Sequence, residues 1–269
     1  MSEYAPRPRE WLWRDRILLR SLTLVDGDPG VNKSTLVCEI TARVTLGRPM
    51  FGSDESSAPA SVILIQGEDT PDDTLERVRA CGADLNRVYV FDQQNGPLAL
   101  PDDIPWLEDR IRETEAKFVA IDPAMSFLSA NANSYQSVHR ALSLLAAMAQ
   151  RTGVAVVLVR HLNKSGGSNP LYRGAGSIGL IGAVRSALLV GLDPSDPGLR
   201  ILAQTKTNLN RTVESLSFRP ICRNGSVAIQ WLGTSPLPPR RYLNQWPGNP
   251  APSSKRPCRS YVRCSLTVR

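Results

Sequence analysis

Hydrophobic and polar positions divide the first 160 residues into continuous apolar runs that alternate with amphipathic stretches. The apolar runs have the length of strands and cover residues 22–25, 61–66, 88–91, 118–121 and 154–159. The stretches between them, residues 33–46, 72–81, 104–116 and 135–151, have the patterning of helices. Strands of continuous apolar residues that alternate with helices are typical of a parallel sheet covered on both faces. An α/β fold is therefore predicted.

The pattern changes after a further predicted helix at residues 177–186. Four short apolar runs follow, at residues 187–190, 200–204, 215–219 and 227–231. Turn sequences separate them, for example Arg-Asn-Gly at residues 223–225. Short strands joined by such turns favour antiparallel pairing. We therefore predict a mostly parallel sheet with antiparallel strands added at its C-terminal edge.

Charge and proline divide the chain into three regions. Residues 235–269 contain seven of the 32 basic residues, seven of the 21 prolines and no acidic residue, so the remaining chain has 25 basic and 25 acidic residues. We expect an N-terminal arm (1–20), a neutral core (21–234) and a basic, proline-rich tail (235–269) without regular structure. The tail either binds phosphate backbones through its charge or only keeps the chain in solution.

Nothing in the apolar pattern predicts a membrane segment. The longest candidate, residues 179–191, contains Arg185 and is shorter than the roughly 20 residues that cross a bilayer. Residues 1–20 mix Glu, Arg and Pro and have no apolar signal-peptide core. We expect a cytoplasmic protein. The sequence contains no Cys-x-x-Cys pair, so it predicts neither a zinc site nor a redox motif.

Residues 27–34 (GDPGVNKS) follow the phosphate-loop pattern Gly-x4-Gly-Lys-[Ser/Thr] at all but one position. In such a loop, backbone N–H groups face the phosphates and the next helix directs its positive end toward the anion. Asn32 occupies the place of the second glycine. Asn tolerates a left-handed backbone, so we expect the loop to form, with the side chain crowding the phosphates. The predicted ligand is ATP, and the predicted contacts are Gly27, Asp28, Pro29, Gly30, Val31, Asn32, Lys33, Ser34 and Thr35.

Carboxylates at two strand ends predict the remaining chemistry. Asp122 closes the strand 118–121 and, with the Ser34 hydroxyl, is the expected Mg²⁺ ligand. Glu68 follows the strand 61–66, which we expect to lie beside the phosphate-loop strand. A carboxylate there can accept a proton from an attacking water. Asp69 is the alternative base, although it fits better as a helix cap.

His161 follows the strand 154–159, where a polar side chain can contact the γ-phosphate. A single histidine at a strand end is more often an ordinary hydrogen-bonded polar residue. Its neighbourhood changes this interpretation. The segments 159–164 (VRHLNK), 173–178 (RGAGSI), 183–185 (AVR) and 204–208 (QTKTN), preceded by 67–69 (GED) and 81–84 (CGAD), resemble the RepA-like branch of RecA-type ATPases. That branch includes replicative helicases of plasmids and phages.

The resemblance implies a RecA-like P-loop core that assembles as a hexameric ring with ATP between neighbouring subunits. It also implies that His161 senses the γ-phosphate. Together with Lys33 of the phosphate loop and Glu68 at its strand end, His161 is a predicted catalytic residue. Arg173 or Lys206 would enter the neighbour's site as the finger that neutralises transition-state charge. The chain departs from the family at Asn32 and at residues 20–21, where Arg-Ser replaces the usual Gly-Lys.

Two functions follow from these features. The first is an ATP-hydrolysing, helicase-type motor that acts on single-stranded DNA in plasmid, phage or mobile-element replication. The alternative is a regulatory ATP-binding switch with weak turnover and a protein partner. A small-molecule kinase is disfavoured, because neither an acceptor site nor a lid is evident in the sequence.

Overall fold

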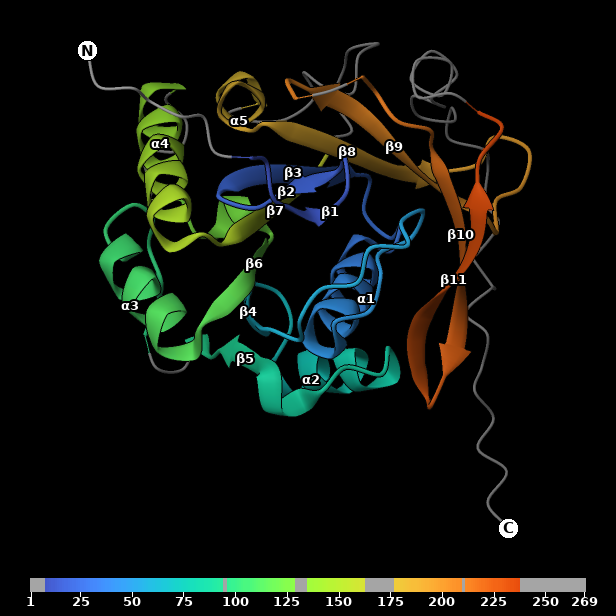
Figure 1. Cartoon of the computed structure of the whole chain (residues 1–269), viewed down its shortest axis with the longest axis horizontal. Coiled ribbons are helices and arrows are strands. Elements are labelled where there is room, and N and C mark those ends of the chain that lie inside the picture. The colour runs from blue at the N-terminus through green and yellow to red at the C-terminus, as the bar shows by residue number, and fades with distance from the viewer. Residues whose placement is uncertain (1–7, 94–95, 129–134, 163–176, 210, 238–269) are drawn as a thin grey trace, which may run out of the picture.

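A computed structural model describes residues 8–93, 96–128, 135–162, 177–209 and 211–237 (Figure 1). A nine-stranded sheet forms its centre, in the order β11-β10-β9-β8-β3-β7-β6-β4-β5. These strands are β3 (Ser21–Gly27), β4 (Ser61–Gln66), β5 (Val88–Phe91), β6 (Ala116–Asp122), β7 (Ala155–His161), β8 (Ser186–Leu192), β9 (Arg200–Thr207), β10 (Leu216–Arg223) and β11 (Ser226–Thr234). Strands β5, β4, β6, β7, β3 and β8 are parallel, while β9, β10 and β11 are antiparallel, so the predicted α/β architecture is confirmed.

The topology corrects two details of the sequence prediction. Strand β8 was expected to be antiparallel, but it pairs in parallel with β3, because helix α5 (Ser177–Ala183) returns the chain to the edge where β3 begins. Strand β4 was expected beside the phosphate-loop strand. It is separated from β3 by β7 and β6.

Helices cover both faces of the sheet. Helices α1 (Lys33–Leu46) and α2 (Pro71–Ala80) pack on one face, and α3 (Ile104–Thr114) and α4 (Tyr135–Thr152) pack on the other (Figure 1). Two 3₁₀ turns, η1 (Leu85–Arg87) and η3 (Ala124–Ser126), occupy connections. Most side chains of α1 are buried, because the hairpin β10–β11 curves over the side of α1 and α2 that faces away from the parallel strands. A helix that is covered on all sides is apolar around most of its circumference.

Local signals in the sequence define several element ends. Helix α1 stops at Gly47, which has φ 65° and donates its N–H to the carbonyls of Arg43 and Val44. Thr70 caps α2 by accepting a hydrogen bond from the Asp73 N–H. Asn224 and Gly225 both have positive φ (50° and 83°) between β10 and β11. That is the backbone of a type I′ hairpin turn.

The described part of the N-terminal arm packs against the core. Strands β1 (Trp11–Trp13) and β2 (Ile17–Leu18) form a small antiparallel pair. Trp13 is 1% exposed. Its Nε1 donates to the Phe51 carbonyl at 2.8 Å, and its ring meets Trp231 edge-on at 5.9 Å. The arm therefore contributes to the hydrophobic core on the α1 face.

Of the basic tail, the structure describes only residues 235–237, so the expectations for the remainder lie outside the described residues. Within the described part of the chain, no helix combines the length and apolar character needed to cross a membrane.

Candidate nucleotide-binding site

The predicted phosphate loop connects β3 to α1 at the C-terminal edge of the parallel strands. Gly27 is required by close packing, since a Cβ there would lie 2.4 Å from the carbonyl oxygen of Val190. Gly30 has φ 79°. Asn32 is the N-cap of α1 with φ 71° and ψ 35°, so it supplies the left-handed backbone expected of it. The loop thus has left-handed backbone at Gly30 and Asn32 and leads into the N-terminus of α1, where the helix dipole favours an anion.

Lys33 lies inside this loop. Its side chain is buried, and Nζ donates to the carbonyl oxygens of Gly27 (3.0 Å) and Asp28 (2.9 Å). The same Nζ is 3.0 Å from Nδ1 of His161, at the end of β7. Burial lowers the pKa of Lys33 to about 8, although the nearby carboxylates, with Asp122 first, act in the opposite direction. The lysine is therefore held where an anionic phosphate would restore the stability of its charged form.

Ser34 and Asp122 form the second pair of the site. The Ser34 hydroxyl donates to Oδ2 of Asp122 at 2.7 Å. Asp122 closes β6 and is buried, which raises its pKa, while the hydrogen bond from Ser34 acts to lower it. A hydroxyl and a carboxylate from separate elements form the partial oxygen set that Mg²⁺ uses together with phosphate oxygens. These residues therefore fit the expected ion.

The geometry separates Glu68 from its competitor Asp69. Oε2 of Glu68 lies 3.7 Å from Nε2 of His161, and the Glu68 side chain is exposed at the mouth of the site. Both carboxylate oxygens of Asp69 bond instead to the guanidinium of Arg77 on α2. Glu68 is thus near His161 although two strands, β7 and β6, separate β4 from β3.

The bend after β4 explains how Glu68 reaches His161. The Gly67 N–H donates to the Asp122 carbonyl at 2.8 Å, which ties the chain to the end of β6. A Cβ on Gly67 would lie 3.2 Å from Ser126 and Phe127. The absent side chain therefore lets the backbone pass close to η3 and turn Glu68 toward the phosphate loop.

Two contacts near the loop have no counterpart in the sequence prediction. Arg200, the first residue of β9, donates from Nε to Oδ1 of Asn32 at 3.3 Å, so the Asn32 side chain has a partner in the structure. Arg160 forms a bidentate pair with Asp26, with both distances 2.7 Å. The sequence contains a signal for the Asp26–Arg160 pair, because these opposite charges follow two apolar runs that form strands.

Of the two candidate finger residues, the structure describes Lys206 but not Arg173. Lys206 on β9 pairs in register with Ala187, at the start of β8, so it lies toward the edge opposite the phosphate loop. Its Nζ donates to the carbonyls of Ile181 and Val184 at the end of α5, and its partial burial lowers its pKa. Lys206 therefore does not join its own chain's site. Arg173 lies outside the described residues.

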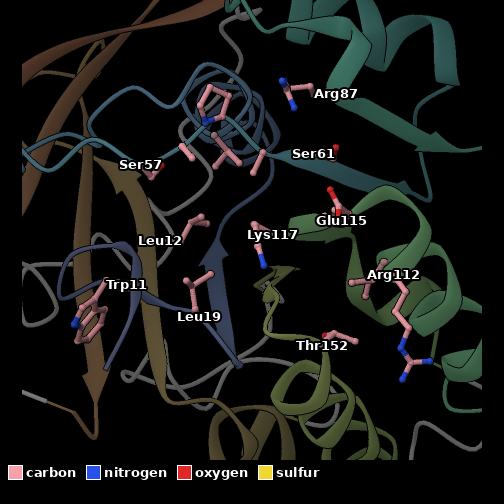
Figure 2. A pocket seen from close by; sticks show the side chains of 16 residues that line it. Trp11, Leu12, Leu19, Ser57, Ser61, Arg87, Arg112, Glu115, Lys117 and Thr152 are labelled. Atoms are coloured by element: carbon pink, nitrogen blue, oxygen red, sulfur yellow. The ribbon is translucent and has the colours of Figure 1, made fainter. Parts of the chain in front are cut away.

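A cavity of about 600 Å³ also lies away from the phosphate loop. Figure 2 shows its lining, in which Leu12 and Leu19 of the N-terminal region face Lys117 and Thr152. These residues lie at the edge where the parallel strands begin. None of the residues predicted to bind nucleotide or metal lines it.

The fold and the phosphate loop together define a P-loop ATPase of the RecA-like type. Residues 2–167 match a family described as an AAA domain, which is more than half of the chain, so the protein belongs to that family.

Relatives named "DNA repair protein RadA" are similar over part of the chain. The Bacillus subtilis protein is 25% identical over 150 residues, which is 54% of this chain and 29% of the relative. The Mycobacterium tuberculosis H37Rv protein is 28% identical over 152 residues, which is 54% of this chain and 28% of the relative. The matches therefore span less than a third of the length of these relatives.

Proposed function

We propose that this protein binds ATP with Mg²⁺, hydrolyses it, and uses the cycle as a helicase-type motor on single-stranded DNA. The observation that carries the proposal is a single cluster at the C-terminal edge of the sheet. In it, Lys33 contacts His161, His161 faces Glu68, and Ser34 bonds to Asp122. Residues from four separate segments of the chain thus meet at one phosphate loop.

Each residue has a role that its position supports. The loop N–H groups and Lys33 bind the β- and γ-phosphates, and Ser34 and Asp122 hold Mg²⁺, which neutralises phosphate charge when bound. Glu68 is exposed to solvent and accepts the proton of the attacking water. His161 lies between Lys33 and Glu68, so it is placed to link the γ-phosphate to the water-activating carboxylate.

The proposed DNA substrate rests on likeness to other proteins. The resemblance to RepA-like ATPases favours replication of a plasmid, phage or mobile element, whereas the relatives are named for DNA repair. Both point to DNA. The RepA-like resemblance also favours a homo-oligomeric, hexameric ring in which Lys206 or Arg173 completes the neighbour's site. The position of Lys206 away from its own phosphate loop is compatible with that role.

The decisive experiment compares the ATPase rate with and without single-stranded DNA on protein whose assembly is measured by light scattering. A ring whose turnover rises with DNA supports the motor. Lys33→Ala should abolish turnover because it removes the charged phosphate contact. Lys117→Ala, which removes an exposed lysine from the opposite edge, is the matched control and should retain activity.

Two results would contradict the proposal. A monomer that binds ATP but turns over slowly and ignores DNA would favour the regulatory switch. Unchanged ATPase activity in Lys33→Ala would place the active site elsewhere.

A further inference from the structure

Asn32 occupies a position where the phosphate-loop pattern has glycine, and its side chain contacts a distant strand. Oδ1 of Asn32 accepts a hydrogen bond from Nε of Arg200 at 3.3 Å. Arg200 is also fixed locally, because Nη1 donates to the Pro197 carbonyl at 2.7 Å and to the Leu199 carbonyl at 3.4 Å. The guanidinium is therefore held in place by the turn before β9 while its Nε bonds to the loop.

Arg200 approaches the phosphate loop from one side of β3, and His161 and Asp122 lie on the other side. In the sheet, β9 and β8 lie on one side of β3, and β7 and β6 lie on the other. His161 and Asp122, which would face the phosphates and Mg²⁺, belong to β7 and β6. Arg200 thus bonds to the Asn32 amide from the β8–β9 side of β3, whereas His161 and Asp122 belong to strands on the other side.

We propose that Arg200 is a positioning residue for the phosphate loop. It holds the Asn32 amide away from the phosphates, and so allows asparagine to occupy a glycine position in a left-handed conformation. The proposal rests on the proposed nucleotide binding and adds a residue to that same site. A role of this kind depends on the Asn32 side chain, whereas a direct phosphate contact by Arg200 would not.

A double-mutant cycle separates these two roles. Wild type, Asn32→Gly, Arg200→Ala and the double variant are titrated with the fluorescent analogue mant-ATP in the presence of Mg²⁺. In the wild-type background, Arg200→Ala should weaken binding by roughly 2- to 12-fold, the range of one net hydrogen bond. In the Asn32→Gly background, the same change should alter the dissociation constant by less than about two-fold, because the amide that Arg200 holds is already absent and the two changes are coupled.

Arg200→Gln tests whether geometry or charge is responsible. Gln places a neutral N–H donor at the same number of bonds from the backbone as Nε of Arg. It should preserve the affinity of the protein that keeps Asn32, although the positive charge is gone. Arg112→Ala is the charge-matched control, because Arg112 belongs to α3 and pairs with Glu108 and Asp109 rather than with the loop or the turn before β9. It should leave affinity unchanged.

Equal losses from Arg200→Ala in both backgrounds would overturn the proposal in favour of a direct contact with the nucleotide. The absence of a loss in the wild-type background would also overturn it. Thermal midpoints of all variants identify any loss that comes from unfolding, and Arg200→Gln then supplies the comparison in a folded protein. Failure of the proposed function would look different, since wild type would not bind mant-ATP or Lys33→Ala would bind it equally well.

Discussion

Replacing Asp26 by Asn should destabilise the protein far more than the loss of an ordinary ion pair. Asp26 and Arg160 are buried, with side chains 3% and 1% exposed. They pair in register across β3 and β7, one residue before Gly27 and His161 respectively. The substitution keeps the shape of the side chain but leaves the Arg160 charge without a counter-charge.

The structure sets the magnitude of this effect. Both carboxylate oxygens of Asp26 accept from Arg160, and Nη1 of Arg160 is buried without a partner among the described residues. Removing one member of a buried ion pair costs about 3–5 kcal/mol. Replacing both members by apolar residues is often nearly neutral. The double variant Asp26→Leu/Arg160→Met should therefore regain most of the stability that Asp26→Asn loses.

Urea unfolding followed by tryptophan fluorescence measures the effect as a lower midpoint at unchanged slope. In a thermal melt, the loss corresponds to a decrease of roughly 10 °C for a chain of this size. Asp196→Asn is the matched control, because it breaks the half-exposed pair with Arg219. The reasoning is refuted if Asp26→Asn shifts the midpoint no further than this control does.

Three further predictions concern the site itself. Glu68→Gln should leave ATP binding intact and slow hydrolysis by roughly 10²- to 10⁴-fold, while Asp69→Asn, whose carboxylate bonds to Arg77, should slow it much less. The reverse pattern in single-turnover assays would transfer the base to Asp69. Because burial lowers the pKa of Lys33 to about 8 and phosphate binding favours the charged ammonium, ATP affinity should be constant below pH 8 and decrease above it. An ATP affinity that does not change from about pH 6.5 to 9.5 would contradict this. If the Lys33→Arg variant binds ATP, its affinity should not depend on pH in this range, because arginine stays charged. Mixing Lys206→Ala with Lys33→Ala protein should restore some ATPase activity if sites are shared between subunits, whereas wild-type activity that does not depend on concentration would argue against sharing.

The local structure was predictable because its causes lie within a few residues of each element. Apolar runs define most strands to within a few residues, and Gly47 ends α1 as its position after the helical pattern suggests. The spacing of Gly27, Lys33 and Ser34 identifies the loop, because a chain that wraps a phosphate needs those residue types in that order. Even the departure at Asn32 was interpretable, since few residues other than glycine tolerate a left-handed backbone.

Only the tertiary structure determines which strands and which side chains are neighbours. Two strands separate β4 from β3, and β8 is parallel to β3, because crossover connections rather than strand sequences set the order and direction of strands in a sheet. The pairs Asp26–Arg160 and Asn32–Arg200 join residues 134 and 168 positions apart. Such contacts arise when separate strands meet at one edge of the sheet, and no local pattern of hydrophobic and polar residues encodes that meeting.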